Sequence, residues 1–335
     1  MGFSLAAVIA ALLAGLGSTP TPAREVPPGP RLSFAVDSHR ATAGDEVRSV
    51  GPDGGASFRL AGGGKSLMQL PIDWTSQVSW SRDGERFAFA GAPPQAGRFG
   101  IYVGDADGSD VHLVPESTFY HFLGAPIIAP DGRSVVFLLA DGDSSSAFFS
   151  LPIDGGKLRR LTPSREELYE PSGFTPDGKA IAVTRPVPTE DQAATVALGS
   201  GKLTVLAKDA SEPVFAPDGS VLMVRDHQPS IEEGGHVTDL TSSDLLVMRP
   251  GAAPEKVITV KGGLAWPTID PSGDRIAFTR LEGQTTPVLS NKNNVVDEVN
   301  IDGSCLTKVV SRRGETFAGT SWQPGPGRGA GPISC

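Results

Sequence analysis

The sequence has no cluster of positive charge. Lys and Arg total 29 against 38 Asp and Glu, a formal net charge of −9 at pH 7, and no stretch is dominated by basic residues. Nucleic acids and anionic membrane surfaces both select for clustered positive charge. We therefore expect neither of them to be the main partner.

Helical periodicity and cysteine are also scarce. Hardly any stretch repeats its apolar residues every 3.6 positions, whereas 41 glycines and 29 prolines are interspersed with β-branched and aromatic runs. This composition is typical of a turn-rich all-β protein and not of a disordered chain. Cys305 and Cys335 are the only cysteines.

The one long apolar run lies at the N-terminus. Residues 3–16 are apolar apart from Ser4 and Gly15 and lead to Thr21-Pro-Ala23, and the run is shorter than the roughly 20 residues of a membrane-spanning helix. The pattern predicts a signal peptide over residues 1–23, a linker over 24–30, and an extracytoplasmic protein, secreted or held in the periplasm or cell envelope without membrane insertion after cleavage. Because no Lys or Arg precedes the run, an uncleaved anchor or a misplaced start codon are the alternatives.

A β-hairpin unit recurs down the chain. In its first copy Val78 and Trp80 lead into the turn Arg82-Asp-Gly84, and Phe87 and Phe89 begin the return strand. Asp-Gly supplies the positive φ angles that a tight turn requires. The turn glycines of the copies stand at positions 84, 132, 178, 219 and 273, so the spacings are 48, 46, 41 and 54 residues. Spacings of this size are typical of one four-stranded propeller blade per repeat.

A second type of hairpin lies between successive copies of the first. Its turns are at residues 52–54, 105–108, 154–156, 199–201, 250–251 and 302–304. Six second hairpins therefore accompany only five complete first hairpins. The missing part is at the C-terminus, where residues 320–324 match the strand that contains Trp80 but are followed by no return strand.

The N-terminal segments 31–36, 46–50 and 56–60 have the pattern of the missing strands. We predict an all-β, six-bladed propeller of four-stranded blades as a single monomeric domain over residues 31–335. Its ring is closed by a mixed blade, with strand 320–324 innermost and residues 325–335 as a tail. Such closure removes open sheet edges.

Segments such as Phe215-Ala-Pro-Asp-Gly219 and Arg160-Leu-Thr162 carry a family resemblance. The repeat resembles the WD-like "SPDG" repeat of TolB-like β-propellers over about residues 31–324. Arg82 replaces proline in the first copy, and Ser272 replaces aspartate in the last. TolB itself has an additional N-terminal α/β domain that takes part in its cell-envelope contacts. The resemblance covers the propeller part only, so that role is not carried over.

No catalytic motif accompanies the repeats. Neither a Gly-x-Ser-x-Gly nucleophile elbow nor a His-Glu-x-x-His zinc motif is present. Residues 105–110 and 225–243 contain carboxylates or histidines, but the first has the pattern of an Asp-Gly turn and the second that of a solvated loop. We predict no catalytic residue, no metal and no cofactor. The alternative is a six-bladed hydrolase or lactonase acting on a small molecule at the channel mouth.

The function that we favour is that of an exported, non-catalytic binding module. The longer loops emerge opposite the Asp-Gly turns, and several carry large aromatic residues beside polar ones, the composition of an interface hot spot. We predict that a protein, peptide or cell-wall component binds this long-loop face, through Trp74, Tyr120, His121, Tyr169, Glu170, Glu212 and Trp266.

The two cysteines are predicted to form a disulfide. Both hairpin turns of a blade lie on one face, so Cys305, just after the turn at 302–304, shares its face with the exit of the strand that ends at Pro324. The 11 residues 325–335 can span about 36 to 40 Å, which is ample for Cys335 to reach the neighbouring blade. Export makes the bond chemically reasonable.

Overall fold

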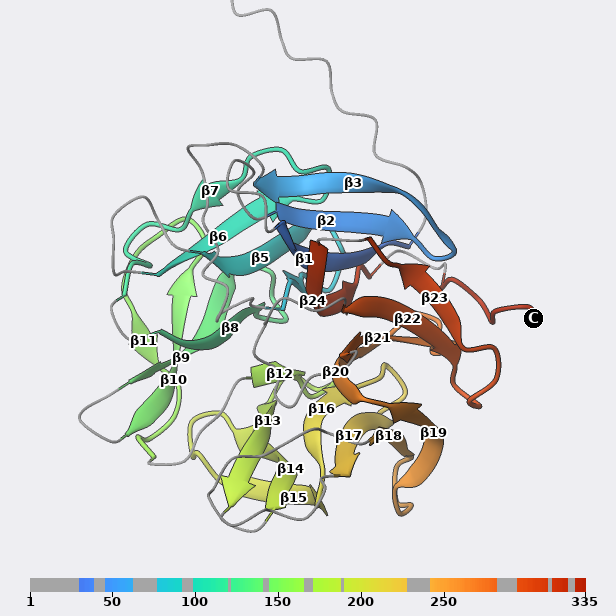
Figure 1. The fold of residues 1–335 in the computed structure, drawn as a ribbon. Coiled ribbons are helices and arrows are strands. Elements are labelled where there is room, and N and C mark those ends of the chain that lie inside the picture. Colours follow the sequence, from blue (N-terminus) through green and yellow to red (C-terminus); the bar gives the residue numbers. More distant parts are fainter. Residues whose placement is uncertain are drawn as a thin grey trace, which may run out of the picture.

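The protein is a ring of six β-sheets. The computed structural model describes residues 30–38, 46–62, 77–91, 99–119, 122–140, 145–165, 171–187, 190–227, 242–281, 294–312, 315–324 and 329–335. Within these ranges 24 strands form six four-stranded antiparallel sheets around a common axis (Figure 1). The predicted six-bladed propeller is confirmed. No helix in the described part of the chain is long and apolar enough to cross a membrane.

The strands of each blade follow one another from the axis outward. Blade 1 comprises β4 (Ser79–Trp80), β5 (Arg86–Gly91), β6 (Gly100–Asp105) and β7 (His112–Leu113); blade 2, β8 (Phe122–Ile128), β9 (Ser134–Ala140), β10 (Ser146–Pro152) and β11 (Arg159–Arg160); blade 3, β12 (Pro171–Phe174), β13 (Ala180–Val187), β14 (Glu190–Ala197) and β15 (Leu203–Lys208). Blade 4 comprises β16 (Ser211–Phe215), β17 (Val221–His227), β18 (Ser242–Met248) and β19 (Glu255–Lys261); blade 5, β20 (Gly263–Ile269), β21 (Arg275–Leu281), β22 (Val295–Asn300) and β23 (Thr307–Val310).

Blade 6 joins the two ends of the chain. It consists of β24 (Glu315–Trp322), β1 (Leu32–Ser38), β2 (Glu46–Gly51) and β3 (Gly54–Gly62), in that order from the axis. The mixed blade is thus confirmed, but its innermost strand spans 315–322 and not the predicted 320–324. Gly319 and Thr320 form a bulge opposite β1, which interrupts the alternation that marks a strand in the sequence.

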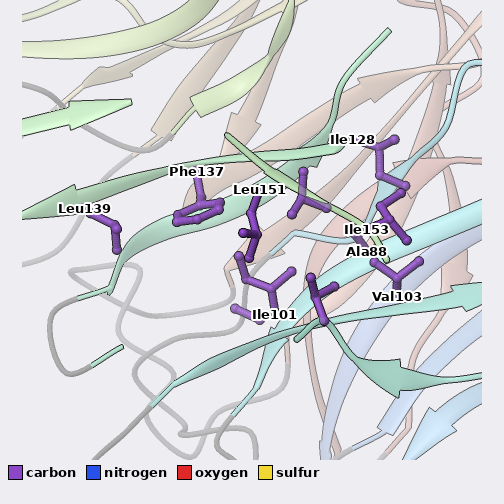
Figure 2. Packing of buried hydrophobic residues seen from close by; sticks show 11 residues of the cluster. Ala88, Ile101, Val103, Ile128, Phe137, Leu139, Leu151 and Ile153 are labelled. Atoms are coloured by element: carbon purple, nitrogen blue, oxygen red, sulfur yellow. The ribbon is translucent and has the colours of Figure 1, made fainter. Parts of the chain in front are cut away.

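Blades are buried on both faces because each packs between two neighbours. In β5 large and small side chains alternate. Phe87 and Phe89 face blade 6 in a stack that continues to Tyr102, with ring centroids 6.0 and 5.4 Å apart. Ala88 faces blade 2, where Phe137 and other apolar side chains fill the space between the blades (Figure 2). The run Phe-Ala-Phe-Ala therefore serves two cores at once.

The Asp-Gly turns are held by a repeated hydrogen-bond pattern. The Asp83 carboxylate accepts bonds from the Ser81 hydroxyl at 2.6 Å and the Glu85 N–H at 3.1 Å. The Ser81 bond first, and then the backbone bond, lower the pKa of Asp83. In blade 5 the serine and the aspartate have exchanged positions, and Ser272 donates to Asp270 at 2.5 Å. The Ser272 departure from the repeat therefore preserves the turn.

Ring closure predicts a difference between two glycine substitutions. Gly84 and Gly132 occupy the same turn position, with φ of 71° and 67°. A Cβ at Gly84 would lie 1.7 Å from the Pro324 carbonyl oxygen, whereas one at Gly132 would have nothing within 4 Å. We expect Gly132→Ala to lower the free energy of unfolding by about 1 kcal/mol through the positive φ. Gly84→Ala should lower the free energy of unfolding by about 1 to 3 kcal/mol more than Gly132→Ala, because the added Cβ pushes Pro324 and the end of β24 away. Equal urea midpoints for the two variants would contradict this.

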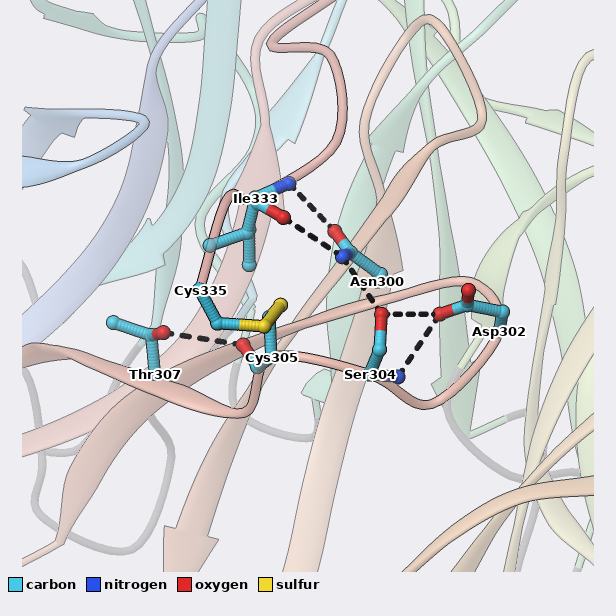
Figure 3. The surroundings of a disulfide bond; sticks show 7 residues. All are labelled: Asn300, Asp302, Ser304, Cys305, Thr307, Ile333 and Cys335. Carbon is cyan, nitrogen blue, oxygen red and sulfur yellow. Dashed lines mark hydrogen bonds between the residues drawn. A yellow bond between two sulfur atoms is a disulfide. The ribbon is translucent and has the colours of Figure 1, made fainter.

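The C-terminal tail is attached to blade 5 (Figure 3). Cys305 and Cys335 form the predicted disulfide, with their Cα atoms 5.5 Å apart. The Asn300 side chain donates to the Ile333 carbonyl at 3.0 Å and accepts from the Ile333 N–H at 2.6 Å. The side-chain amide of Asn300 thus bonds both backbone groups of Ile333, as the backbone of a neighbouring strand would.

Candidate functional site

A cavity lies on the axis of the ring, between the innermost strands. It has a volume of about 360 Å³ and receives residues from all six blades. The innermost strand of each blade has no strand on its inner side, so its inner edge faces the axis. The described residues that line it are Gln77–Trp80, Arg82, Ala125–Ile128, Pro130, Ser172–Pro176, Val214–Pro217, Thr268, Ser321, Trp322 and Pro324.

The cavity wall is mainly apolar, with a few hydroxyl groups. Blades 2 to 4 contribute Ile127, Phe174 and Val214, whereas Ser79 and Thr268 come from blades 1 and 5. These two hydroxyl groups already accept backbone N–H bonds from neighbouring blades, at 3.0 and 3.3 Å. They therefore also join the blades to one another.

Two tryptophans of the wall retain unused hydrogen-bond donors. Trp80 and Trp322 hold equivalent positions in blades 1 and 6 and are 8% and 4% exposed. Neither indole Nε1 has an acceptor among the described residues. Both nitrogen atoms are buried in the packing between blades, so these donors are not exposed to a ligand in the cavity.

The mouth of the cavity is on the face of the Asp-Gly turns. It is formed by the residue that precedes the Asp-Gly position in five blades: Arg82, Pro130, Pro176, Pro217 and Pro324. The four prolines present a rigid apolar rim, because proline has no backbone N–H and a fixed φ. Arg82, which is exposed, is the one charged side chain among the described residues that line the cavity.

A belt of hydrogen bonds joins five blades near the end of the cavity away from the mouth. The Glu212 N–H donates to the Thr184 hydroxyl at 2.8 Å, and the Glu212 carboxylate accepts from the Trp266 N–H. The Trp266 carbonyl accepts from the Thr320 hydroxyl, and Gln77 donates to the Thr320 carbonyl at 3.0 Å. The belt thereby connects blades 3, 4, 5, 6 and 1.

The belt explains two unusual backbone conformations. Glu212 and Trp266 have φ of 50° and 52°, and Gly319, at the same position of blade 6, has φ of 64°. A residue other than glycine in this region costs of order 1 kcal/mol or more and persists only where its surroundings hold it. The bonds across the blades hold both residues here, which gives Glu212 and Trp266 a structural role in the ring.

Of the seven residues predicted to bind a partner, the structure describes and brings together two, Glu212 and Trp266. The other five, Trp74, Tyr120, His121, Tyr169 and Glu170, lie outside the described residues. The long-loop face therefore stays a prediction.

The residues that line the cavity cannot be recognised in the sequence. Most channel-facing positions lie in short runs at the innermost strands, and they include serine, glycine, isoleucine and valine, so no local pattern marks them. Arg82 is the exception, because it stands at a position of the repeat that is otherwise proline.

Six four-stranded blades around an apolar axial cavity define the chain as a six-bladed β-propeller with a pocket of ligand size. The fold is that of the TolB propeller. TolB from Acinetobacter baumannii is similar with a TM-score of 0.66 and 16% identity, over 88% of this chain and 66% of that one. The present chain therefore spans about two thirds of that TolB.

Two further solved structures have the same fold. A protein from Agrobacterium tumefaciens described as a TolB is similar with a TM-score of 0.56 and 18% identity, over 85% of this chain and 90% of that one. A chain of a nidogen/laminin complex is similar with a TM-score of 0.56 and 11% identity, over 88% of this chain and 98% of that one. At these identities the similarity concerns the fold alone. No protein-family model matches the sequence, and neither does any curated protein.

Proposed function

We propose that the protein is a non-catalytic binding module that takes an apolar segment of a protein or peptide partner into its axial cavity. The observation that carries this proposal is the cavity of about 360 Å³, with its apolar wall and its rim of prolines. Ligand pockets typically measure about 300 to 1,000 Å³ and combine an apolar lining with a few polar groups. A volume at the low end of that range suits a few side chains of an extended segment.

The chemistry of the wall favours binding over hydrolysis. A lactonase-type site needs carboxylates or histidines that converge from several blades. The described part of the wall offers hydroxyl groups, the Gln77 amide and Arg82. These groups orient a ligand, and the propeller of the nidogen/laminin structure belongs to a complex between proteins.

Export is part of the same proposal. The disulfide between Cys305 and Cys335 supports an oxidising compartment, in agreement with the predicted signal peptide. We therefore propose that the partner is located in the cell envelope or outside the cell.

The test is to fill the cavity. Val214 lines it, whereas Val205 on β15 is 39% exposed at the outer edge of the neighbouring blade. A library of random hexapeptides displayed on phage is panned on the whole protein and on the Val214→Trp and Val205→Trp variants, after far-UV circular dichroism has shown that each is folded. We expect apolar hexapeptides that bind the wild type and Val205→Trp, and at least tenfold weaker binding to Val214→Trp. Equal binding to all three, or no selected hexapeptide at all, would refute the proposal.

A further inference from the structure

Arg82 stands where the other five blades have proline. The corresponding residues are Pro130, Pro176, Pro217, Pro271 and Pro324. Proline suits this position of the turn, because its fixed φ and missing N–H match the turn geometry. An arginine contributes nothing that the turn requires, so its side chain must be explained by what it faces.

The guanidinium of Arg82 is available for a ligand. Arg82 is one of the residues that line the cavity, it is exposed, and it forms no ion pair with any described residue. Its neighbour Asp83 is already engaged by Ser81 and the Glu85 N–H within the turn. Asp83 keeps its negative charge but forms no ion pair with Arg82, so the guanidinium is left to pair with a ligand.

The other carboxylates of this face are directed into their own turns. The carboxylates of Asp131, Asp177 and Asp218 accept N–H bonds from residues two positions later, at 2.9, 3.1 and 2.8 Å. None of the three belongs to the cavity lining. Arg133 and Lys179 follow two of these aspartates in the sequence and offset part of their charge. Arg82 is thus the charge nearest to a bound segment.

We infer that the segment that enters the cavity carries an aspartate or glutamate next to its apolar residue, and that this carboxylate pairs with Arg82. This inference rests on the proposed function. An apolar side chain inserts between Phe174 and Val214, while the backbone of the partner crosses the mouth. Arginine presents its N–H donors in a planar fork that matches a carboxylate, so it selects this group over a neutral amide.

The position of Arg82 favours a side-chain carboxylate of the partner over its C-terminal carboxylate. The mouth lies at the surface, and the cavity extends inward past apolar residues. A chain end that entered first would place its terminal carboxylate among apolar groups, where an unpaired charge is strongly unfavourable. A side chain next to the inserted residue reaches the rim instead.

The experiment uses one hexapeptide selected on the wild type, synthesised with an acetylated N-terminus in three forms. The first keeps its acidic side chain and the second has the corresponding side-chain amide, and both have an amidated C-terminus. The third has the side-chain amide and a free C-terminal carboxylate. Binding to the wild type, Arg82→Pro and Arg82→Lys is measured by fluorescence anisotropy at low and high salt. Arg82→Pro restores the residue of the other blades, so it should fold.

We expect the acidic form to bind the wild type about three- to tenfold more tightly than the amide form, with the difference reduced by salt. Arg82→Lys should keep part of the preference, and Arg82→Pro should lose it while still binding the amide form. A preference that survives in Arg82→Pro, equal binding of the two forms to the wild type, or a third form as tight as the first would overturn the inference. In all three cases binding blocked by Val214→Trp would leave the proposed function intact.

Discussion

Replacing Glu298 by glutamine is expected to remove a pH dependence of stability. Between about pH 5 and 9 the free energy of unfolding of the wild type should fall by several kcal/mol more than that of Glu298→Gln. Glu298 is 1% exposed, and burial raises its pKa from 4.5 to about 8, against the opposing effect of Arg275. Each pKa unit corresponds to about 1.4 kcal/mol.

The direction of this effect follows from the two pKa values. Because the pKa is higher in the folded protein than in the unfolded chain, the folded protein holds a proton that the unfolded chain releases above about pH 4.5. The stabilisation is complete below that pH and is lost as the pH rises through about 8. Glutamine has the shape of the protonated acid but does not titrate.

The surroundings of Glu298 explain why it can stay neutral. Arg275 lies 3.3 Å from one carboxylate oxygen of Glu298, but it also pairs with Asp53 at 2.9 Å. Its positive charge is therefore balanced when Glu298 is protonated. The other oxygen, Oε1, has no hydrogen-bond partner among the described residues, so ionisation would leave a buried charge half satisfied.

The measurement is urea unfolding of both proteins from pH 5 to 9. Glu255→Gln, on the exposed outer strand β19, controls for the substitution itself. Titration of all other groups is common to the three proteins and cancels in the differences. Parallel curves for the wild type and Glu298→Gln would show that Glu298 is ionised in the folded protein throughout this range.

Removal of the disulfide is expected to lower the free energy of unfolding by about 3 to 4 kcal/mol. The bond joins residues 30 positions apart, and the estimate is the chain entropy that a loop of this length regains in the unfolded state. The loss should show in the Cys305→Ser/Cys335→Ser double variant as a lower urea midpoint. The bond also holds the tail that follows β24, so its removal weakens the closure of the ring.

Two controls separate the bond from other effects of the substitutions. A thiol reductant should lower the midpoint of the wild type and leave that of the double variant unchanged. Cys305 has φ of 59°, so a Cys305→Gly/Cys335→Ser variant relieves strain that serine retains and should be more stable than the serine pair by about 1 kcal/mol. An unchanged wild-type midpoint after reduction would show that Asn300 and the other tail contacts suffice without the bond.

The architecture could be predicted because its signals are local and repeated. An Asp-Gly turn between apolar strands needs only a few adjacent residues, and five copies with similar spacing predict the blade. The mixed blade followed from counting hairpins at the two ends, and the disulfide from the presence of two cysteines. In each case a short stretch, or a count of short stretches, carries the information.

The axial site depends on residues that are far apart in the sequence. Gln77 and Thr320 meet across 243 positions, and Arg275 and Asp53 across 222. Glu212 and Trp266 adopt positive φ because hydrogen bonds from other blades hold them there, and their neighbours in the chain give no sign of it. The cavity itself exists because six separate strands meet at one axis. Its apolar character, and the single charge of Arg82 at its mouth, arise from the ring as a whole, since each blade supplies only part of the wall.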